Sequence, residues 1–344
     1  MYQFEELTEN ELWTQTIKGC SYSSAFHSLE WRDALEHSFK QLEASYFLIK
    51  ETDTIVGALP CFVFSPTPMT KMCLSMPFNL FGGPLVKDES PLHLKPFILN
   101  LNQKLNELAH NLGVCETVIT LPPLASPKIG VLLKDTGYEE REQLFTHLLK
   151  TDPDYSVLWN AYNKRIRGAV RKAEKNNVVV RDSDSEEDLK AFYEMYLAMM
   201  QRFGSTPKPL SMMRFLQESS IAKLAIAECS GVIIAGLLYL FFNHTVTPWC
   251  EASLPEFLEF RPNNAIIHHI IRWACQEGYD WVDLGTSPPE REGLIAFKEQ
   301  WRAKQYNYSI YAKVYSPWKR KIWTASEPVL RKIYGLIQRL KVGI

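Results

Sequence analysis

The same order of apolar strands and polar turns occurs twice in this 344-residue sequence. An apolar run, a tight polar turn and a second apolar run occupy Ser45–Phe64 in the first half and Lys223–Asn243 in the second. Gly57 and Gly236 hold equivalent places in the two second runs. Tight polar turns between apolar runs predict β-hairpins. A repeat of roughly 150 residues is too long for a solenoid, so the sequence predicts a duplicated α/β unit.

Helical segments flank both expected hairpins. The longest are Pro91–Leu112 and Asn263–Glu277, and a short expected strand follows each of them. Gly113 and Gly278 come directly after these helices, as C-terminal caps do. The predicted fold class is therefore α/β (α+β), with two tandem domains whose mixed sheets are flanked by helices. The expected domains are residues 1–150 and 151–316, followed by a C-terminal helix at 317–344.

The composition argues against several classes of protein. A formal net charge of -1 does not suit a surface built as a whole to hold nucleic acid. Seven cysteines without C-x-x-C spacing indicate reduced core thiols rather than a disulfide framework or a metal site. The longest apolar run, Val232–Phe242, has about half the length that a bilayer requires. The acidic N-terminus does not resemble a signal peptide, so we expect a cytoplasmic protein.

The segment Gly278–Trp301 carries the most informative polar residues. An apolar strand in this segment ends in a polar turn, and a short helical stretch follows. Asp283 lies within that strand, where a carboxylate is costly unless it is paired or used. The carboxyl ends of strands are where α/β sheets commonly hold ligands. We therefore expect Asp283 to orient or deprotonate a substrate amine or, alternatively, to cap the Thr286–Ser287 turn or pair with a neighbouring arginine.

Lys298 follows in the same segment, among apolar and aromatic neighbours. Acyl transfer to an amine builds negative charge on the carbonyl oxygen, and a fixed cation nearby stabilises that charge. We therefore expect Lys298 to stabilise the oxyanion. The alternative is a helix lysine that lays its stem on the core and extends its ammonium group into water. Glu251 and Glu290 are weaker candidates for the general base.

Two further segments carry candidate phosphate-binding residues. Arg261, Asn263 and Asn264 open a helix whose free N–H groups favour an anion, although ordinary capping is the alternative. The stretch 162–177 holds six basic residues and one acidic residue. Its candidate ligands, which share one helical face, are Lys164, Arg167 and Arg171. This face predicts contact with substrate phosphate or, as the default, a solvated basic surface. No metal site is expected.

These segments together resemble a known family, the GNAT-like acyltransferases of the FemAB type, including the BioF2-like acetyltransferase domain. The segments that carry the resemblance are Phe26–Trp31, Phe78–Pro84, Lys164–Arg167, Phe203–Pro207, Arg261–Asn264, Asp283–Gly285 and Phe297–Lys298. The resemblance implies two tandem GNAT-like domains that transfer an acyl or aminoacyl group to an amine. It also implies that Phe297 and Lys298 lie where the group is transferred.

In the resulting hypothesis the first domain shapes the acceptor pocket. The candidate lining residues are Trp31, Gly82 and Gly83, because glycines let a backbone approach a ligand closely. A plain turn is the alternative explanation for the two glycines. The acceptor is expected to be a small-molecule or lipid-linked cell-envelope precursor, or an amino sugar.

The expected activity is N-acyl transfer to an amino group of that acceptor, with a transferred group other than aminoacyl. Acyl-CoA and aminoacyl-tRNA are the candidate donors. Arg261–Ile266 lacks the glycines with which acetyl-CoA-dependent GNAT enzymes usually hold pyrophosphate, which argues against acetyl-CoA. The alternatives are a tRNA-dependent aminoacyl transferase of the peptidoglycan-bridge type and a non-catalytic binding module.

The C-terminal segment 317–344 differs in character from the rest of the chain. It contains seven basic residues and one acidic residue, with two tryptophans. One apolar stripe at helical spacing is formed by Leu330, Ile333, Tyr334, Ile337 and Leu340. A basic amphipathic helix with tryptophans suits peripheral contact with the inner face of a membrane. The alternative is a helix docked on the second domain or on a partner protein.

Overall fold

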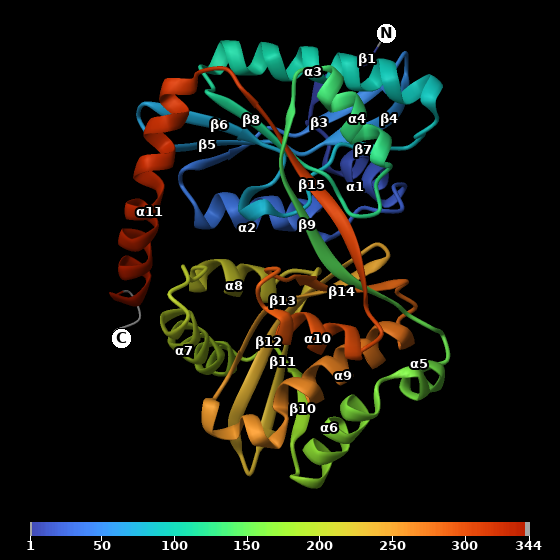
Figure 1. The fold of residues 1–344 in the computed structure, drawn as a ribbon, viewed down its shortest axis with the longest axis vertical. Helices are drawn as coiled ribbons and strands as arrows, with labels where there is room; N and C mark the ends of the chain where they lie inside the picture. The colour runs from blue at the N-terminus through green and yellow to red at the C-terminus, as the bar shows by residue number, and fades with distance from the viewer. Residues whose placement is uncertain (1, 341–344) are drawn as a thin grey trace. The chain divides into compact units, whose positions relative to one another are not determined.

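The structure, a computed structural model, describes residues 2–340 and divides into two compact units (Figure 1). The first unit contains the residues up to Phe145 and then Tyr306–Pro328. The second unit contains Thr146–Gln305 and the residues from Val329 onward. The domains predicted from the sequence are contiguous and meet at residue 150. The first unit of the structure also includes a segment near the C-terminus. Elements that contribute residues to both units are β9 (Glu139–Lys150), β15 (Lys304–Val314) and α11 (Pro317–Leu340).

The first unit holds two sheets. One is antiparallel, with the strand order β1 (Tyr2–Glu6), β3 (Phe47–Glu51), β4 (Thr54–Leu59) and β7 (Leu85–Val86). The other has the order β15, β8 (Glu116–Thr120), β6 (Thr70–Leu74), β5 (Phe62–Thr67) and β2 (Leu42–Ala44), with a parallel β6–β8 pair. The sequence predicted one strand through to Phe64, but the chain changes sheets at Pro60 and Cys61. A proline suits this break because it has no N–H group to donate to a ladder.

Helices cover the sheets of the first unit. They are α1 (Asn10–Lys18), α2 (Leu29–Ser38), α3 (Pro91–Leu112) and α4 (Pro127–Asp135). Helix α3 has the predicted bounds and ends at Gly113, whose φ of 65° is left-handed. Phe97 of α3 packs into the space that Gly57 of β4 leaves open. A Cβ atom at Gly57 would lie 2.8 Å from the Phe97 ring and 2.5 Å from the Leu85 carbonyl oxygen.

The sheet of the second unit is mixed, as the sequence predicted. Its strand order is β10 (Val179–Ser183), β11 (Ala222–Cys229), β12 (Val232–Phe242), β13 (Thr245–Ser253), β14 (Trp281–Thr286) and then the end of β9. The β13–β14 pair is parallel, and the hairpin pairs β11–β12 and β12–β13 are antiparallel. The predicted hairpin at Lys223–Asn243 is therefore observed as β11 and β12, shifted by one residue at each end.

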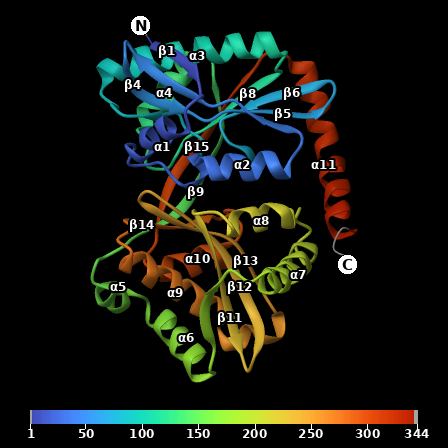
Figure 2. The same cartoon turned by 180° about the vertical axis from the view of Figure 1, so that it is seen from behind.

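The helices of the second unit lie on both faces of this sheet, with α7 and α9 on opposite faces (Figures 1 and 2). They are α5 (Tyr155–Ala161), α6 (Lys164–Lys175), α7 (Glu186–Arg202), α8 (Leu210–Gln217), α9 (Pro262–Gln276) and α10 (Glu292–Gln300). Gly236 of β12 leaves space for an aromatic ring, as Gly57 does in the first unit. A Cβ atom at Gly236 would lie 2.6 Å from the Phe192 ring of α7. In both units, the glycine in the second hairpin strand makes room for a phenylalanine from a helix.

Helix α11 ends at Leu340, and residues 341–344 of the predicted C-terminal helix lie outside the described residues. Among residues 2–340, no helix combines the length and the apolar character needed to span a bilayer. All seven cysteines are buried free thiols.

Candidate active site

Lys298 is buried on α10, with 7% of its surface exposed. Its ammonium group donates hydrogen bonds to the backbone carbonyls of Gly285 at 2.8 Å and Thr286 at 3.1 Å. Burial lowers the pKa of Lys298 to about 8, although the charges of Asp283 and Glu251 act in the opposite direction. The site therefore holds an ammonium group that is still protonated at neutral pH and is poorly solvated.

The turn at the end of β14 provides the two carbonyl groups. Asp283 is 3% exposed, and its Oδ1 accepts a hydrogen bond from the Gly285 N–H group at 2.9 Å and another from the Thr146 hydroxyl. Gly285 has a φ of 80°, a left-handed conformation that favours glycine. Asp283 thus fixes the turn that holds Lys298, which is the capping role named as its alternative. Burial raises the pKa of Asp283, while its two hydrogen bonds and Lys298 lower it.

Thr146 and His147 of β9 also belong to this site, and the sequence analysis did not identify them. The β9–β14 register pairs Thr146 with Thr286, and both Thr146 and His147 are fully buried. Burial lowers the pKa of His147, and the charge of Lys298 lowers it further, so the imidazole is neutral at neutral pH. Two polar residues inside the apolar run Phe145–Leu149 were the available signal.

Glu251 of β13 completes the group of candidate catalytic residues. It lies opposite Leu237 in the sheet and is exposed to solvent. Surrounding protein nevertheless removes part of the water from its carboxylate and raises its pKa, whereas the charge of Lys298 lowers it. Lys298, Asp283 and Glu251 are therefore close enough for their charges to interact. An ammonium group beside two carboxylates can stabilise an anion and accept a proton in one site.

Phe297 and the start of α9 pack against the apolar core of the second unit. Phe297 is partly buried, and its ring centroid lies 6.2 Å from that of Trp301. Arg261 is the N-cap of α9, with a left-handed φ of 64° and an exposed side chain. Asn263 is partly buried and Asn264 is buried. The side chain of Arg261 makes no capping hydrogen bond, so its charge is available at the helix start.

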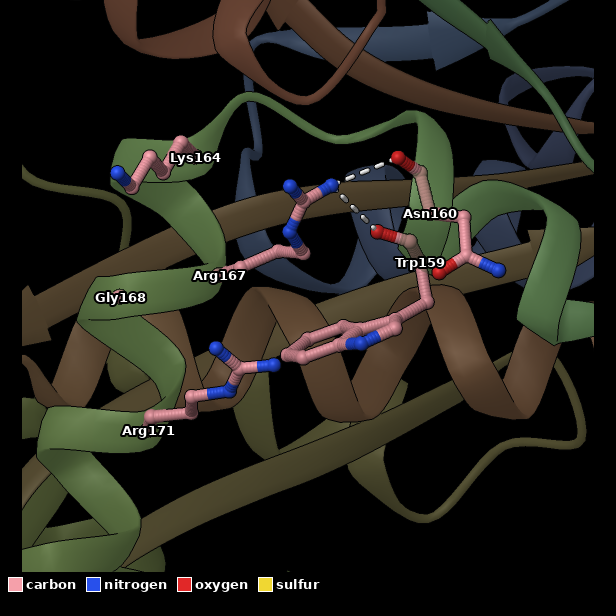
Figure 3. Close-up of a pocket in the computed structure, with 6 residues that line it drawn as sticks. All are labelled: Trp159, Asn160, Lys164, Arg167, Gly168 and Arg171. Atoms are coloured by element: carbon pink, nitrogen blue, oxygen red, sulfur yellow. Dashed lines mark hydrogen bonds between the residues drawn. The ribbon is translucent and has the colours of Figure 1, made fainter.

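The three basic candidates of α6 line a hollow of about 440 Å³ in the second unit (Figure 3). Its lining residues are Trp159, Asn160, Lys164, Arg167, Gly168 and Arg171. Arg167 donates through Nη1 to the carbonyls of Asn160 at 2.7 Å and Tyr162 at 2.9 Å, which fixes its guanidinium. The guanidinium of Arg171 lies 5.8 Å from the centre of the Trp159 ring. The structure thus brings together Lys164, Arg167 and Arg171 as predicted candidates, with Trp159 added.

The candidates of the first unit have clear packing roles. Trp31 is fully buried and packs against Phe26, with ring centroids 5.0 Å apart. Gly82 and Gly83 donate backbone hydrogen bonds to the Thr120 carbonyl at 3.0 and 3.2 Å. A Cβ atom at Gly82 would lie 2.4 Å from the Ser75 backbone, so the close approach is to the protein's own chain. The structure therefore places these three residues in the packed interior of the first unit.

Comparisons with known proteins can now be set beside this geometry. Residues 160–307 match the family model described as the acetyltransferase (GNAT) domain. Over 151 residues the chain is 22% identical to a UDP-N-acetylmuramoylpentapeptide-lysine N(6)-alanyltransferase of Weissella viridescens. This match covers 42% of the chain and 45% of that relative, so it spans less than half of either protein.

Two solved structures resemble the fold over nearly the whole chain. The structure titled FemX has a TM-score of 0.76 and 16% identity, and the match covers 93% of this chain and 99% of that one. A tandem GNAT protein from the clavulanic acid biosynthesis pathway has a TM-score of 0.59 and 12% identity, with coverage of 92% and 99%. These likenesses confirm the predicted fold class of two tandem GNAT-like domains.

One expectation from the sequence is wrong. We expected a transferred group other than aminoacyl, but the matched relative is an alanyltransferase and therefore transfers an aminoacyl group. The sequence signal for the transferred group was weak, because the expectation depended on general GNAT chemistry and on no residue that contacts the group. The domain match and the two structural likenesses agree on a GNAT-like fold. The chain thus has a two-domain GNAT-like fold, and its residues 160–307 match the acetyltransferase (GNAT) domain.

Proposed function

We propose that this protein transfers an aminoacyl group from an activated ester to a primary amine of a cell-envelope precursor. The observation that carries the proposal is the buried Lys298 ammonium, held by the carbonyls of Gly285 and Thr286 beside Asp283 and within reach of the charge of Glu251. An ammonium group has three N–H donors. Two of them bind the turn, and the third is the donor that we assign to the acyl oxygen.

The reaction forms a C–N bond and breaks an ester C–O bond. The amine nitrogen attacks the ester carbonyl carbon, and the carbonyl electrons move to oxygen to give a tetrahedral oxyanion. Lys298 stabilises that oxyanion, and its poor solvation strengthens the attraction. Collapse of the intermediate expels the alkoxide of the donor, while the amine nitrogen loses a proton. The products are an amide and the free hydroxyl of the donor.

Glu251 is the proton acceptor in this proposal. Burial raises the pKa of its carboxylate, which suits a group that takes a proton from an ammonium-like nitrogen and passes it to the departing alkoxide. Asp283 acts as a positioning residue, because its Oδ1 accepts hydrogen bonds from the Thr146 hydroxyl and from the Gly285 N–H group of the turn. Replacement of Asp283 by asparagine is therefore expected to disturb the turn that holds Lys298.

The proposed donor is an aminoacyl-tRNA. The hollow on α6 combines cationic side chains with the face of Trp159, which suits phosphate groups and a flat ring (Figure 3). The start of α9, with Arg261, Asn263 and Asn264, has no glycine-rich loop for a CoA pyrophosphate. We expect tRNA binding to weaken steeply with salt, and the substitutions Lys164→Gln and Arg171→Gln to reduce that salt dependence.

The proposed acceptor is an amine on a precursor of the bacterial cell envelope. The supporting observation is the printed activity of the Weissella viridescens relative, which acts on a lysine N6 atom of a UDP-N-acetylmuramoyl pentapeptide. A lipid-linked form of such an acceptor would lie at the inner face of the membrane.

A transfer assay tests the donor and the acceptor together. The purified protein is mixed with a pool of charged tRNAs and UDP-N-acetylmuramoyl pentapeptide, and the product is weighed by mass spectrometry. The proposal predicts a mass increase of one amino-acid residue that requires charged tRNA and is lost in Lys298→Met. Acylation from acyl-CoA in place of charged tRNA would refute the proposed donor, and full activity of Lys298→Met would refute the assigned role of the lysine.

A further inference from the structure

Helix α11 presents its apolar side to solvent. Six large apolar residues of the described part of α11 are 39–58% exposed; one is Ile337, and the other five form a stripe. These five are Trp318, Ile322, Val329, Ile333 and Leu336, which we call the outer stripe. Their spacing of i, i+4, i+11, i+15 and i+18 places them on one face of a helix. The stripe extends over 18 residues, or about 27 Å at the rise of an α-helix.

The inner face of α11 carries polar and aromatic groups instead. In the first unit, Arg320 forms an ion pair with the buried Glu116 at 2.9 Å, and the Trp323 ring lies 5.5 Å from that of Phe64. In the second unit, Gln338 is buried. A helix that docks only to cover a core buries its apolar face and exposes its charges. Helix α11 differs, because a second set of large apolar residues stays exposed while Arg320 and Trp323 fix the rotation of the helix.

This arrangement corrects the stripe expected from the sequence. Leu330 and Tyr334 are partly buried, whereas Ile333 and Ile337 are exposed, so the predicted stripe is divided between two faces. The side chain of Leu340 lies outside the described part of the helix. The pattern of apolar spacing could not distinguish the two faces because α11 carries apolar residues on both.

Lysines border the outer stripe. Lys321 and Lys332 are exposed and lie along one edge of it at helical spacing. Within residues 2–340, neither lysine has a carboxylate at ion-pair distance. Lys319 lies beside Trp318, with its Nζ 5.7 Å from the centre of the indole ring. The exposed apolar face is thus accompanied by positive charge along its length.

We propose that the outer stripe binds the surface of a bilayer that contains anionic lipids. An exposed apolar face with a terminal tryptophan and flanking lysines can insert between lipid headgroups, while the lysines attract their negative charge. A second copy of this chain is a poorer occupant, because pairing two such faces would bring their lysines together. The inference goes beyond the proposed function, since the contact concerns α11 and is tested without turnover.

Vesicle flotation of the full chain tests this contact. The probes are vesicles of phosphatidylcholine alone and of phosphatidylcholine with phosphatidylglycerol in equal parts. We expect binding to the anionic vesicles and a loss of about tenfold or more in the double variant Val329→Asp/Leu336→Asp. The matched control is Val131→Asp/Leu99→Asp, whose two residues are 61% and 50% exposed on α4 and α3 and should leave binding unchanged.

A second variant, which changes only charge, keeps the test valid if the variant Val329→Asp/Leu336→Asp does not fold. Lys321→Gln/Lys332→Gln retains the apolar face and should weaken binding to anionic vesicles about tenfold while leaving weak binding to neutral vesicles unchanged. Equal binding by the stripe and control variants, or no binding by the natural chain, would overturn the proposal. A dimer in solution that Val329→Asp/Leu336→Asp dissociates would also overturn it, in favour of a second copy. Transfer to a water-soluble acceptor should survive in every α11 variant, so failure here is distinct from failure of the proposed activity.

Discussion

The two units each bury a charged side chain, and they treat it differently. In the first unit, Glu116 of β8 is 1% exposed and is paired with two arginines, Arg141 of β9 and Arg320 of α11. In the second unit, Lys298 is 7% exposed and is held by two backbone carbonyls of a turn. Burial lowers the pKa of Lys298 to about 8, because the charges of Asp283 and Glu251 only partly offset the loss of water around the ammonium group.

We infer from this difference that the charge of Glu116 stabilises the fold, whereas the charge of Lys298 can interact with a substrate. Removing one partner of the Glu116 cluster leaves a buried or half-buried ion without its counter-charge, which is a cost in stability. Removing Lys298 deletes a charge that the fold solvates poorly, which is a cost in chemistry and a small one in stability. The two sites should therefore respond in opposite ways to mutation.

The largest effect is expected at Lys298. The substitution Lys298→Met should lower kcat by about a hundredfold or more, because the oxyanion loses its cation. The melting temperature should fall only slightly. The matched control is Lys313→Met in β15, a partly buried lysine whose pKa is also lowered by burial and whose Nζ binds Asn102 and the Thr136 carbonyl at 2.9 Å. Lys313→Met should lose stability and keep its kcat. A loss of kcat in Lys313→Met with no loss of stability would contradict the distinction between the two lysines.

Glu116 should show the opposite behaviour. The substitution Glu116→Gln removes the counter-charge of Arg141 and Arg320 and should lower the free energy of unfolding by about 3 kcal/mol. Urea denaturation measures the loss, and kcat per folded molecule should be unchanged. A variant as stable as the natural chain would show that the buried cluster contributes no net stability.

Gly57 and Gly236, the equivalent glycines of the two units, allow the packing of the two units to be compared. Gly57→Ala should cost about 2 kcal/mol of unfolding free energy, because its Cβ would meet the backbone oxygen of Leu85 as well as the Phe97 ring. Gly236→Ala should cost about 1 kcal/mol, since the Phe192 ring can shift. Gly168→Ala in α6 is the control, because a Cβ there meets nothing within 4 Å and should raise stability slightly. Equal losses at both glycines would contradict this assignment.

The smallest effect is the pH dependence of kcat. As the pH rises through about 8, folded Lys298 loses its proton, so kcat should fall by about tenfold for each further pH unit. Stability should change in the other direction. The lysine titrates near 10.5 when unfolded, so the unfolded chain binds more protons between these values and its folded form gains stability with pH. A kcat that keeps rising to pH 10 would exclude a charged Lys298 from the rate-limiting step.

Much of the fold followed from local sequence patterns. The bounds of α3, the β11–β12 hairpin and the capping glycines Gly113 and Gly278 were predictable, because apolar spacing and turn residues are local signals. The crossing of β9 and β15 between the units was not predicted. Strand pairing between residues far apart in sequence leaves no local mark, and each strand alone has the pattern of an ordinary apolar strand.

The candidate site was predictable in part for the same reason. Lys298 and Asp283 stand out because each is a charge inside an apolar segment. Thr146 enters the site through the β9–β14 register, and the two carbonyls that bind Lys298 belong to the backbone, so side-chain patterns do not indicate them. Trp31 was expected to line a pocket and lies in the core instead, since an aromatic residue in an amphipathic segment has the same pattern in either place.

The central claim is that the second unit holds a buried, weakly satisfied ammonium group at Lys298. Nuclear magnetic resonance of the lysine side chains, with the Lys298 signal assigned by its absence in Lys298→Met, measures the pKa of this group directly. The account predicts a titration near 8, matching the pH at which kcat begins to fall. A titration near the ordinary value of 10.5 would show that the ammonium group is well solvated, and would contradict both the site and the mechanism proposed for it.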